Sequence, residues 1–109
     1  MADPALTPEL ALEYLAELST DIRAAVVLGA GGEHLAGPGA LAAPARQLLA
    51  AAAGALVEVD TPRGTVVAAA DDVHALAVVV GRHALPALVR YDVRRVLGDL
   101  AGVEEPEAA

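Results

Sequence analysis

The chain has 109 residues and a formal net charge of -8, and it contains no Cys and no Lys. This length fits one domain, and the acidic charge argues against binding to nucleic acid or to anionic membranes, which both depend on cationic side chains. The missing residue types exclude a cysteine nucleophile, a cysteine zinc site and the lysine of a phosphate-binding loop. Without a secretory signal pattern or an apolar run of ~20 residues, a soluble cytoplasmic protein is expected.

The first predicted element is an amphipathic helix over residues 7–20, with Thr7 as its N-cap. Its apolar positions, which recur at helical spacing, are Leu10, Tyr14, Leu15 and Leu18. Away from them, Glu9, Glu13 and Glu17 recur every four residues. The helix therefore has one side for a core and an acidic stripe on another side.

A hairpin is predicted next, from an apolar strand over 23–28, a glycine turn over 29–32 and a short return strand over 33–37. The first of these strands is apolar at nearly every position, so we expect both of its faces to be covered. A second helix is predicted over 42–53. Its apolar positions are Leu41, Leu48, Leu49 and Ala52.

Three consecutive strands are predicted over 56–61, 65–70 and 74–80, joined by short turns. A last helix begins near Pro86 and has the widest apolar stripe of the chain. That stripe consists of Leu85, Leu88, Val89, Val93, Val96, Leu97 and Leu100. The polar side of this helix carries Arg90, Arg94 and Arg95, which either pair with the acidic stripe of the first helix or face solvent.

The glycine turn resembles the start of a dinucleotide-binding fingerprint, but the context for that function is missing. The third glycine of the fingerprint falls at His34, and Gly37, Pro38 and Gly39 prevent the helix that would bind the pyrophosphate. We interpret the turn as an ordinary hairpin connection, and no cofactor is expected.

No metal site is predicted either. Asp71 and Asp72 are adjacent and point in opposite directions on an extended chain, so with His74 they are better explained as a turn. His34 and His83 lie near strand ends and have no Glu or Cys at ligand spacing.

Catalytic residues are also not apparent. Ser19 is the one serine of the sequence, and it lies at the end of the first helix, far from a nucleophile elbow. Glu58 and Asp60 share a face of one strand, but a solvent-facing strand supplies neither a cleft nor two different environments for the carboxylates. We therefore predict that the protein is not an enzyme.

The element order, α-ββ-α-βββ-α, predicts an α/β (α+β) fold with a five-stranded antiparallel sheet and helices on both faces. The segments 12–18 and 21–36 resemble the start of roadblock/dynein light-chain domains, and 64–70 and 76–80 resemble their last two strands. The chain is similar to the bacterial members of this family that regulate GTPases, the gliding-motility-B-like proteins. It departs from them in its Gly-Ala-Gly-Gly turn, its lack of aromatic core residues and its shorter second helix.

The resemblance implies that the second helix lies on one face of a profilin-like sheet and that the other two helices lie on the opposite face. It also implies a homodimer that joins third strands and second helices, for which the interface residues are Leu49, Leu56, Val57, Glu58 and Val59. The alternating third strand would otherwise be an exposed edge. The implied partner is a small Ras-like GTPase, and Arg46 and Gln47 are the polar residues available to contact it.

Two alternatives stay open at this stage. One is a structural or scaffold dimer that keeps the fold without a GTPase, and the other is a small-ligand sensor of the profilin-like or PAS-like type. The domain is expected over residues 7–101, between a flexible N-terminus over 1–6 and an acidic tail over 102–109.

Overall fold

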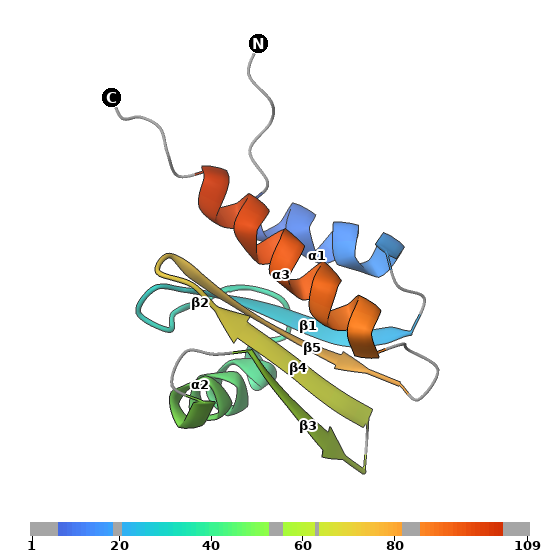
Figure 1. Ribbon diagram of the computed structural model, residues 1–109. Coiled ribbons are helices and arrows are strands. Elements are labelled where there is room, and N and C mark those ends of the chain that lie inside the picture. Colours follow the sequence, from blue (N-terminus) through green and yellow to red (C-terminus); the bar gives the residue numbers. More distant parts are fainter. Residues whose placement is uncertain (1–6, 19–20, 53–55, 63, 82–85, 104–109) are drawn as a thin grey trace, which may run out of the picture.

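The computed structural model describes residues 7–18, 21–52, 56–62, 64–81 and 86–103 (Figure 1). The predicted order of elements is confirmed. The elements are α1 (Pro8–Leu18), β1 (Ile22–Gly29), β2 (His34–Ala36), the 3-10 helix η1 (Gly39–Leu41), α2 (Ala42–Ala52), β3 (Val57–Thr61), β4 (Gly64–Ala70), β5 (His74–Val80) and α3 (Pro86–Val103). The last helix thus continues two residues beyond the predicted end of the domain at 101.

The five strands form one antiparallel sheet in the order β2-β1-β5-β4-β3. The most continuous apolar strand, β5, occupies the centre, where both of its faces are covered. The short strand β2 lies at one edge, and β3 lies at the other edge (Figure 1). Since β3 pairs with β4 alone among the described strands, its outer edge is available for a further strand.

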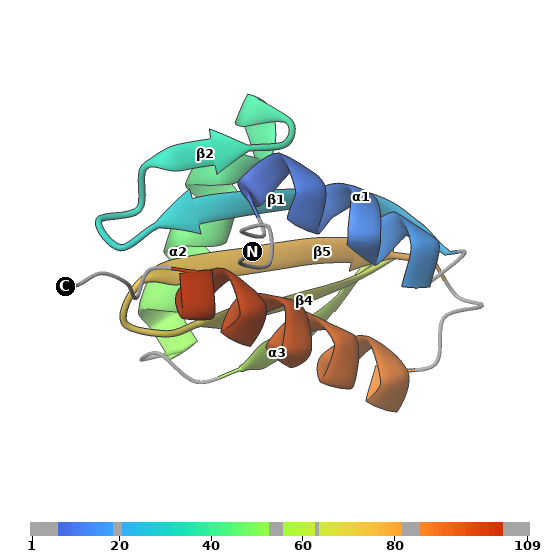
Figure 2. The same cartoon turned by 90° about the horizontal axis from the view of Figure 1, so that it is seen from above.

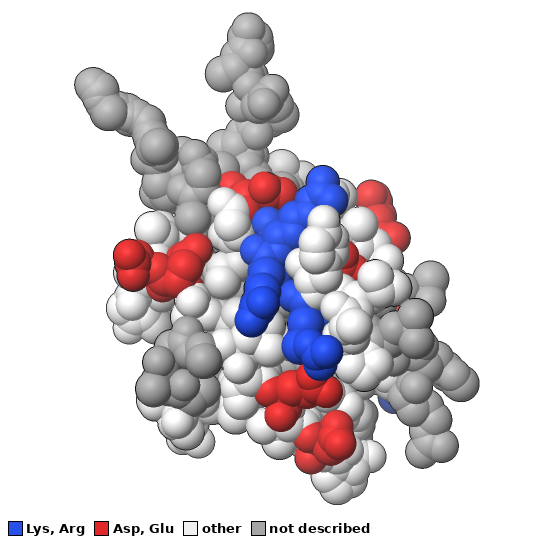
Figure 3. Space-filling model, in the orientation of Figure 1, with Lys and Arg blue, Asp and Glu red and all other residues white. Residues whose placement is uncertain are grey.

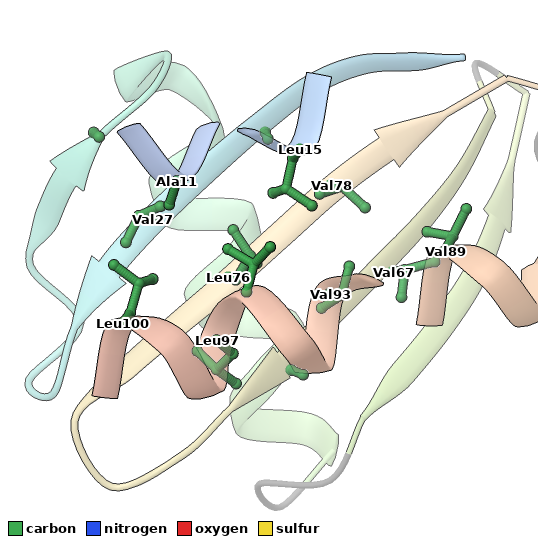
Figure 4. Packing of buried hydrophobic residues seen from close by; sticks show 14 of the residues in the cluster. Ala11, Leu15, Val27, Val67, Leu76, Val78, Val89, Val93, Leu97 and Leu100 are labelled. Atoms are coloured by element: carbon green, nitrogen blue, oxygen red, sulfur yellow. The ribbon is translucent and has the colours of Figure 1, made fainter. Parts of the chain in front are cut away.

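Helices α1 and α3 lie side by side on one face of the sheet, and α2 lies on the opposite face (Figures 1 and 2). This arrangement confirms the fold expected from the sequence. The core beneath α1 and α3 is built from large aliphatic side chains, as Figure 4 shows. The fully buried members include Leu15, Val27, Val67, Leu76, Val78, Val93, Val96 and Leu100.

The core beneath α2 is smaller and is made mostly of alanine. Its buried residues are Val26, Leu28, Ala42, Ala45, Ala68, Ala75 and Ala77. Leu41, Leu48 and Leu49 are half-buried against them. Small side chains on both the helix and the sheet allow close approach, but they remove little apolar area from water.

Three leucines that the sequence assigned to apolar helix faces are exposed. In α1, the buried residues are Ala11 and Leu15, which lie one turn apart on the side that faces the sheet. Leu10 and Leu18 lie to the side of these residues and are exposed. In α3, the line of buried residues begins at Val89, and Leu88 lies about 100° around the helix from it. The prediction was wrong at these positions because a helix offers more apolar positions than the sheet covers. Leu85 lies outside the described residues.

Local signals were more accurate. The hydroxyl of Thr7 accepts a hydrogen bond from the Leu10 amide at 3.2 Å, so the predicted N-cap is confirmed. After β2, Gly37 has a φ of +93°, and a Cβ at this position would lie 2.3 Å from the carbonyl oxygen of Ala25. Glycine is therefore required where the chain leaves the hairpin. In the described part of the chain, no helix is long and apolar enough to cross a membrane.

Candidate interaction surface

The edge strand β3 presents different chemistry on its two faces. Val57 and Val59 point toward the side of the sheet that carries α2, whereas Glu58 points toward the side that carries α3. Its residues are half-buried at Val57 and exposed from Glu58 to Thr61. A regular strand with an open edge is prone to pair with another strand unless something blocks it.

The carboxylates of β3 are held by neighbouring side chains. The guanidinium of Arg90 on α3 donates to Glu58 Oε1 at 2.6 Å, and the hydroxyl of Thr65 on β4 donates to Asp60 Oδ1 at 2.8 Å. These contacts tie β3 to the rest of the domain on the α3 side. Arg90 therefore pairs with a carboxylate of the sheet. The sequence left open whether the arginines of α3 pair with the acidic stripe of α1, and Arg90 does not.

An apolar row crosses four strands beside α2. Paired residues of neighbouring strands share a face, so the register places Ala24, Val79, Val66 and Val59 in one line. The first three are half-buried, and Val59 is 37% exposed. We call these four residues the half-covered row. With 11 residues, α2 is about 16 Å long, and it packs on Val26, Ala68 and Ala77. These residues lie next to the half-covered row on the same face of the sheet, so the row extends beyond the area that α2 covers.

The outward side of α2 consists mostly of alanines and contains little charge. Ala43, Gln47, Ala50 and Ala51 are exposed there, beside Arg46. The guanidinium of Arg46 donates to the carbonyl oxygen of Gly32 at 2.7 Å, so this side chain lies against the turn between β1 and β2. Gln47, by contrast, is exposed on the surface of the helix. We call the outer edge of β3, the half-covered row and the outward side of α2 the edge surface.

The structure divides the predicted interface residues between the two faces of the sheet. Leu49 and Val57 pack in the core beneath α2, and Val59 lies beside them in the half-covered row. Leu56 packs against the core beneath α1 and α3, and Glu58 faces the same way. The predicted residues therefore lie on or next to β3 and on α2, face both sides of the sheet, and do not form a patch on one face.

The half-covered row was missed by reasoning from the sequence. Its members come from four strands, and their alignment depends on a register that no local pattern specifies. The available signal was the shortness of the second helix relative to the strands.

The residues considered for metal binding form a turn. Asp71 Oδ1 accepts hydrogen bonds from the amides of Val73 and His74 at 2.9 and 2.8 Å. The His74 side chain is buried, and its Nδ1 has no hydrogen-bond partner. Among the described residues, no three His, Cys, Asp or Glu side chains are grouped to hold a metal ion. Ser19 and His83 lie outside the described residues.

Comparisons with known proteins identify the fold. No family model and no curated protein matches the chain. Two crystal structures of Roadblock/LC7 domains from Streptomyces avermitilis are similar to it. One has a TM-score of 0.76 and 19% identity over 88% of this chain and 96% of the other. The second has a TM-score of 0.66 and 20% identity over 81% and 92%. The chain therefore has the Roadblock/LC7 fold, as its sequence resemblance implied.

Proposed function

We propose that the chain is a non-catalytic, dimeric platform that binds a small Ras-like GTPase in the bacterial cytoplasm and modulates its nucleotide cycle or its location. A regulatory adaptor domain fits the Roadblock/LC7 fold. The observation that carries the proposal is the edge surface, where an open strand edge and a half-covered row lie beside a short helix.

The open edge of β3 supports the proposed dimerisation. If two copies pair through this strand, their sheets join into one, and backbone amides and carbonyls that face solvent gain partners. The same contact brings the two half-covered rows and the two α2 helices together on one side of the joined sheet. Val59, which is exposed in one copy, would then be covered.

The GTPase would contact the outward sides of the two α2 helices. Their exposed alanines allow a partner to approach the helix backbone closely, and Arg46 and Gln47 supply polar contacts. Because the Arg46 guanidinium already donates to Gly32, we favour a docking contact with a GTPase carboxylate over insertion of an arginine into its active site.

Titration of the purified GTPase with this protein tests the proposal, with binding and GTP turnover both measured. A Ras-like GTPase, if one is encoded beside this chain, is the partner to purify for this test. We expect binding, and we expect Arg46→Ala and Gln47→Ala each to weaken it by up to about tenfold, which corresponds to ~1.4 kcal/mol. Asp72→Ala removes an exposed charge outside α2, at the turn between β4 and β5, and is the control that should leave binding unchanged.

Two results would contradict this proposal in different ways. Tight binding that is indifferent to both α2 substitutions would move the contact away from α2. Absence of binding by a protein that is nevertheless dimeric would favour the structural dimer over the GTPase platform.

A further inference from the structure

The outer surface of α1 and α3 is unusually rich in exposed apolar side chains. Four of the five large hydrophobic residues that are exposed among the described residues lie on these two helices. They are Leu10, Leu18, Leu88 and Tyr91, of which Leu88 is 56% and Tyr91 is 60% exposed. This surface is on the opposite side of the sheet from α2 (Figure 2). A dimer formed through β3 and α2 would therefore leave it uncovered.

Charges of both signs flank these apolar residues. Figure 3 shows arginines gathered in one band over α3, with acidic side chains at either end of the band. Arg90 is occupied by Glu58, but Arg94 and Arg95 are exposed and form no ion pair with another described residue. They line a shallow hollow of about 490 Å³ with Ala87, Arg90 and Tyr91. Two aspartates share the helix: Asp92 is half-buried, and Asp99 lies one turn beyond Arg95.

On α1, the acidic stripe is equally unoccupied. Glu9, Glu13 and Glu17 are all exposed, and none forms an ion pair with another described residue. The neighbouring helices thus present opposite charges side by side without pairing them across the gap between α1 and α3. A partner with charge of one sign would match half of this surface and be repelled by the other half.

We propose that this surface, α1 together with α3, binds the same surface of a second copy of the chain. The two helices run in opposite directions (Figure 1). A two-fold axis parallel to them would place α1 of each copy over α3 of the other. Each acidic stripe then faces the arginines of the partner copy, and Tyr91 and Leu88 are buried between them. Tyrosine and arginine are among the side chains that are enriched at protein interfaces.

The size of the surface fits a weak, reversible contact. Because α1 of each copy lies over α3 of the other, the 11 residues of α1 limit the paired length to about 16 Å, and two packed helices are about 20 Å wide, so the contact buries roughly 700 Å² in total. This area is below that of stable interfaces and belongs to the range of weak, transient contacts. The contact would act in addition to the β3 edge and link dimers into larger assemblies.

Analytical ultracentrifugation over a range of concentrations tests this surface in a Val59→Arg background, which removes the proposed β3 contact. There, self-association at low salt should reach two chains, and it should weaken as salt screens the charges. Arg94→Glu with Arg95→Glu should weaken it at least about tenfold, because each altered helix would then face glutamates. Reversal of the exposed Asp72 to Arg is the control and should have no effect.

A mixture of two charge variants, both made in the Val59→Arg background, makes the test specific. One variant carries Arg94→Glu and Arg95→Glu, so both helices are acidic. The other carries Glu9→Arg, Glu13→Arg and Glu17→Arg, so both are basic. Each should be monomeric alone, and the mixture should form a one-to-one complex. A misfolded variant cannot produce this rescue.

Three results would overturn the proposal. They are a monomeric Val59→Arg protein at every concentration, self-association that is unchanged by the Arg94 and Arg95 substitutions, and a mixture that sediments as separate monomers. Binding of the wild-type protein to phosphatidylserine vesicles that requires Arg94 and Arg95, without self-association, would assign the arginines to a lipid surface instead. Because the Val59→Arg background excludes the β3 contact, none of these outcomes depends on the proposed GTPase platform.

Discussion

The two faces of the sheet are covered to different extents. Two helices of 11 and 18 residues pack large aliphatic side chains on one face, whereas a single helix of 11 residues packs mostly alanines on the other. Hydrophobic stabilisation scales with the apolar area removed from water, so the first face contributes most of the stability. The second face keeps apolar surface at the half-covered row. The fold thus separates the part that holds the domain together from the part that is available for binding.

The largest effect should come from truncating a side chain beneath α3. Leu97→Ala removes a buried leucine and should lower the free energy of unfolding by about 2–5 kcal/mol. Leu49 on α2 is only half-buried, so Leu49→Ala should lower the free energy of unfolding by roughly half as much or less, since less apolar area is lost. Urea denaturation of both variants measures the difference. If Leu49→Ala destabilised the domain more than Leu97→Ala, the contrast between the faces would be wrong.

A matched pair on one strand sharpens the comparison. Val66 and Val67 are neighbours on β4 that point to opposite faces, and Val67 is fully buried whereas Val66 is half-buried in the half-covered row. Replacement of Val67 by Thr buries a hydroxyl and should cost about 1–3 kcal/mol. The same replacement at Val66 leaves the hydroxyl near water and should cost less than about 1 kcal/mol. Equal costs would show that the two faces of the sheet are covered to the same extent, contrary to the comparison.

The smallest effect is expected for the ion pair that links β3 to α3. The side chains of Arg90 and Glu58 are 41% and 29% exposed, so their coupling should be about 0.2–1 kcal/mol. A double-mutant cycle with Arg90→Ala and Glu58→Ala measures it, and it should shrink as salt is added. A coupling well above this range would mean that the α3 side holds the β3 edge more firmly than the packing suggests.

The sequence predicted the element order and the strands well because their signals are local. Alternation in β3, the turn before Gly64 and the apolar run of β5 each depend on neighbouring residues. The helix faces were harder to predict, since Leu10, Leu18 and Leu88 satisfy a helical spacing yet lie outside the width that the sheet covers. Amphipathic spacing gives the direction of a buried face but not its breadth.

The candidate site could be predicted only in part. The sequence pointed to the strand and helix that form the edge surface, because an alternating strand beside an Ala-rich helix is visible locally. The contact of Arg46 with Gly32 joins residues 14 positions apart, and the half-covered row joins residues from four strands. Such contacts arise from tertiary packing, so residue types alone do not indicate them.

The most direct test of the central claim, that the β3 edge is the dimer contact, is the molar mass in solution with and without a charge at Val59. Light scattering in ~0.5 M NaCl suits this test, because charge-based contacts between α1 and α3 are then screened. The wild-type protein should have twice the 10.9 kDa mass of the chain, and Val59→Arg should have the mass of one chain. A wild-type monomer, or a Val59→Arg protein that is still dimeric, would contradict the account.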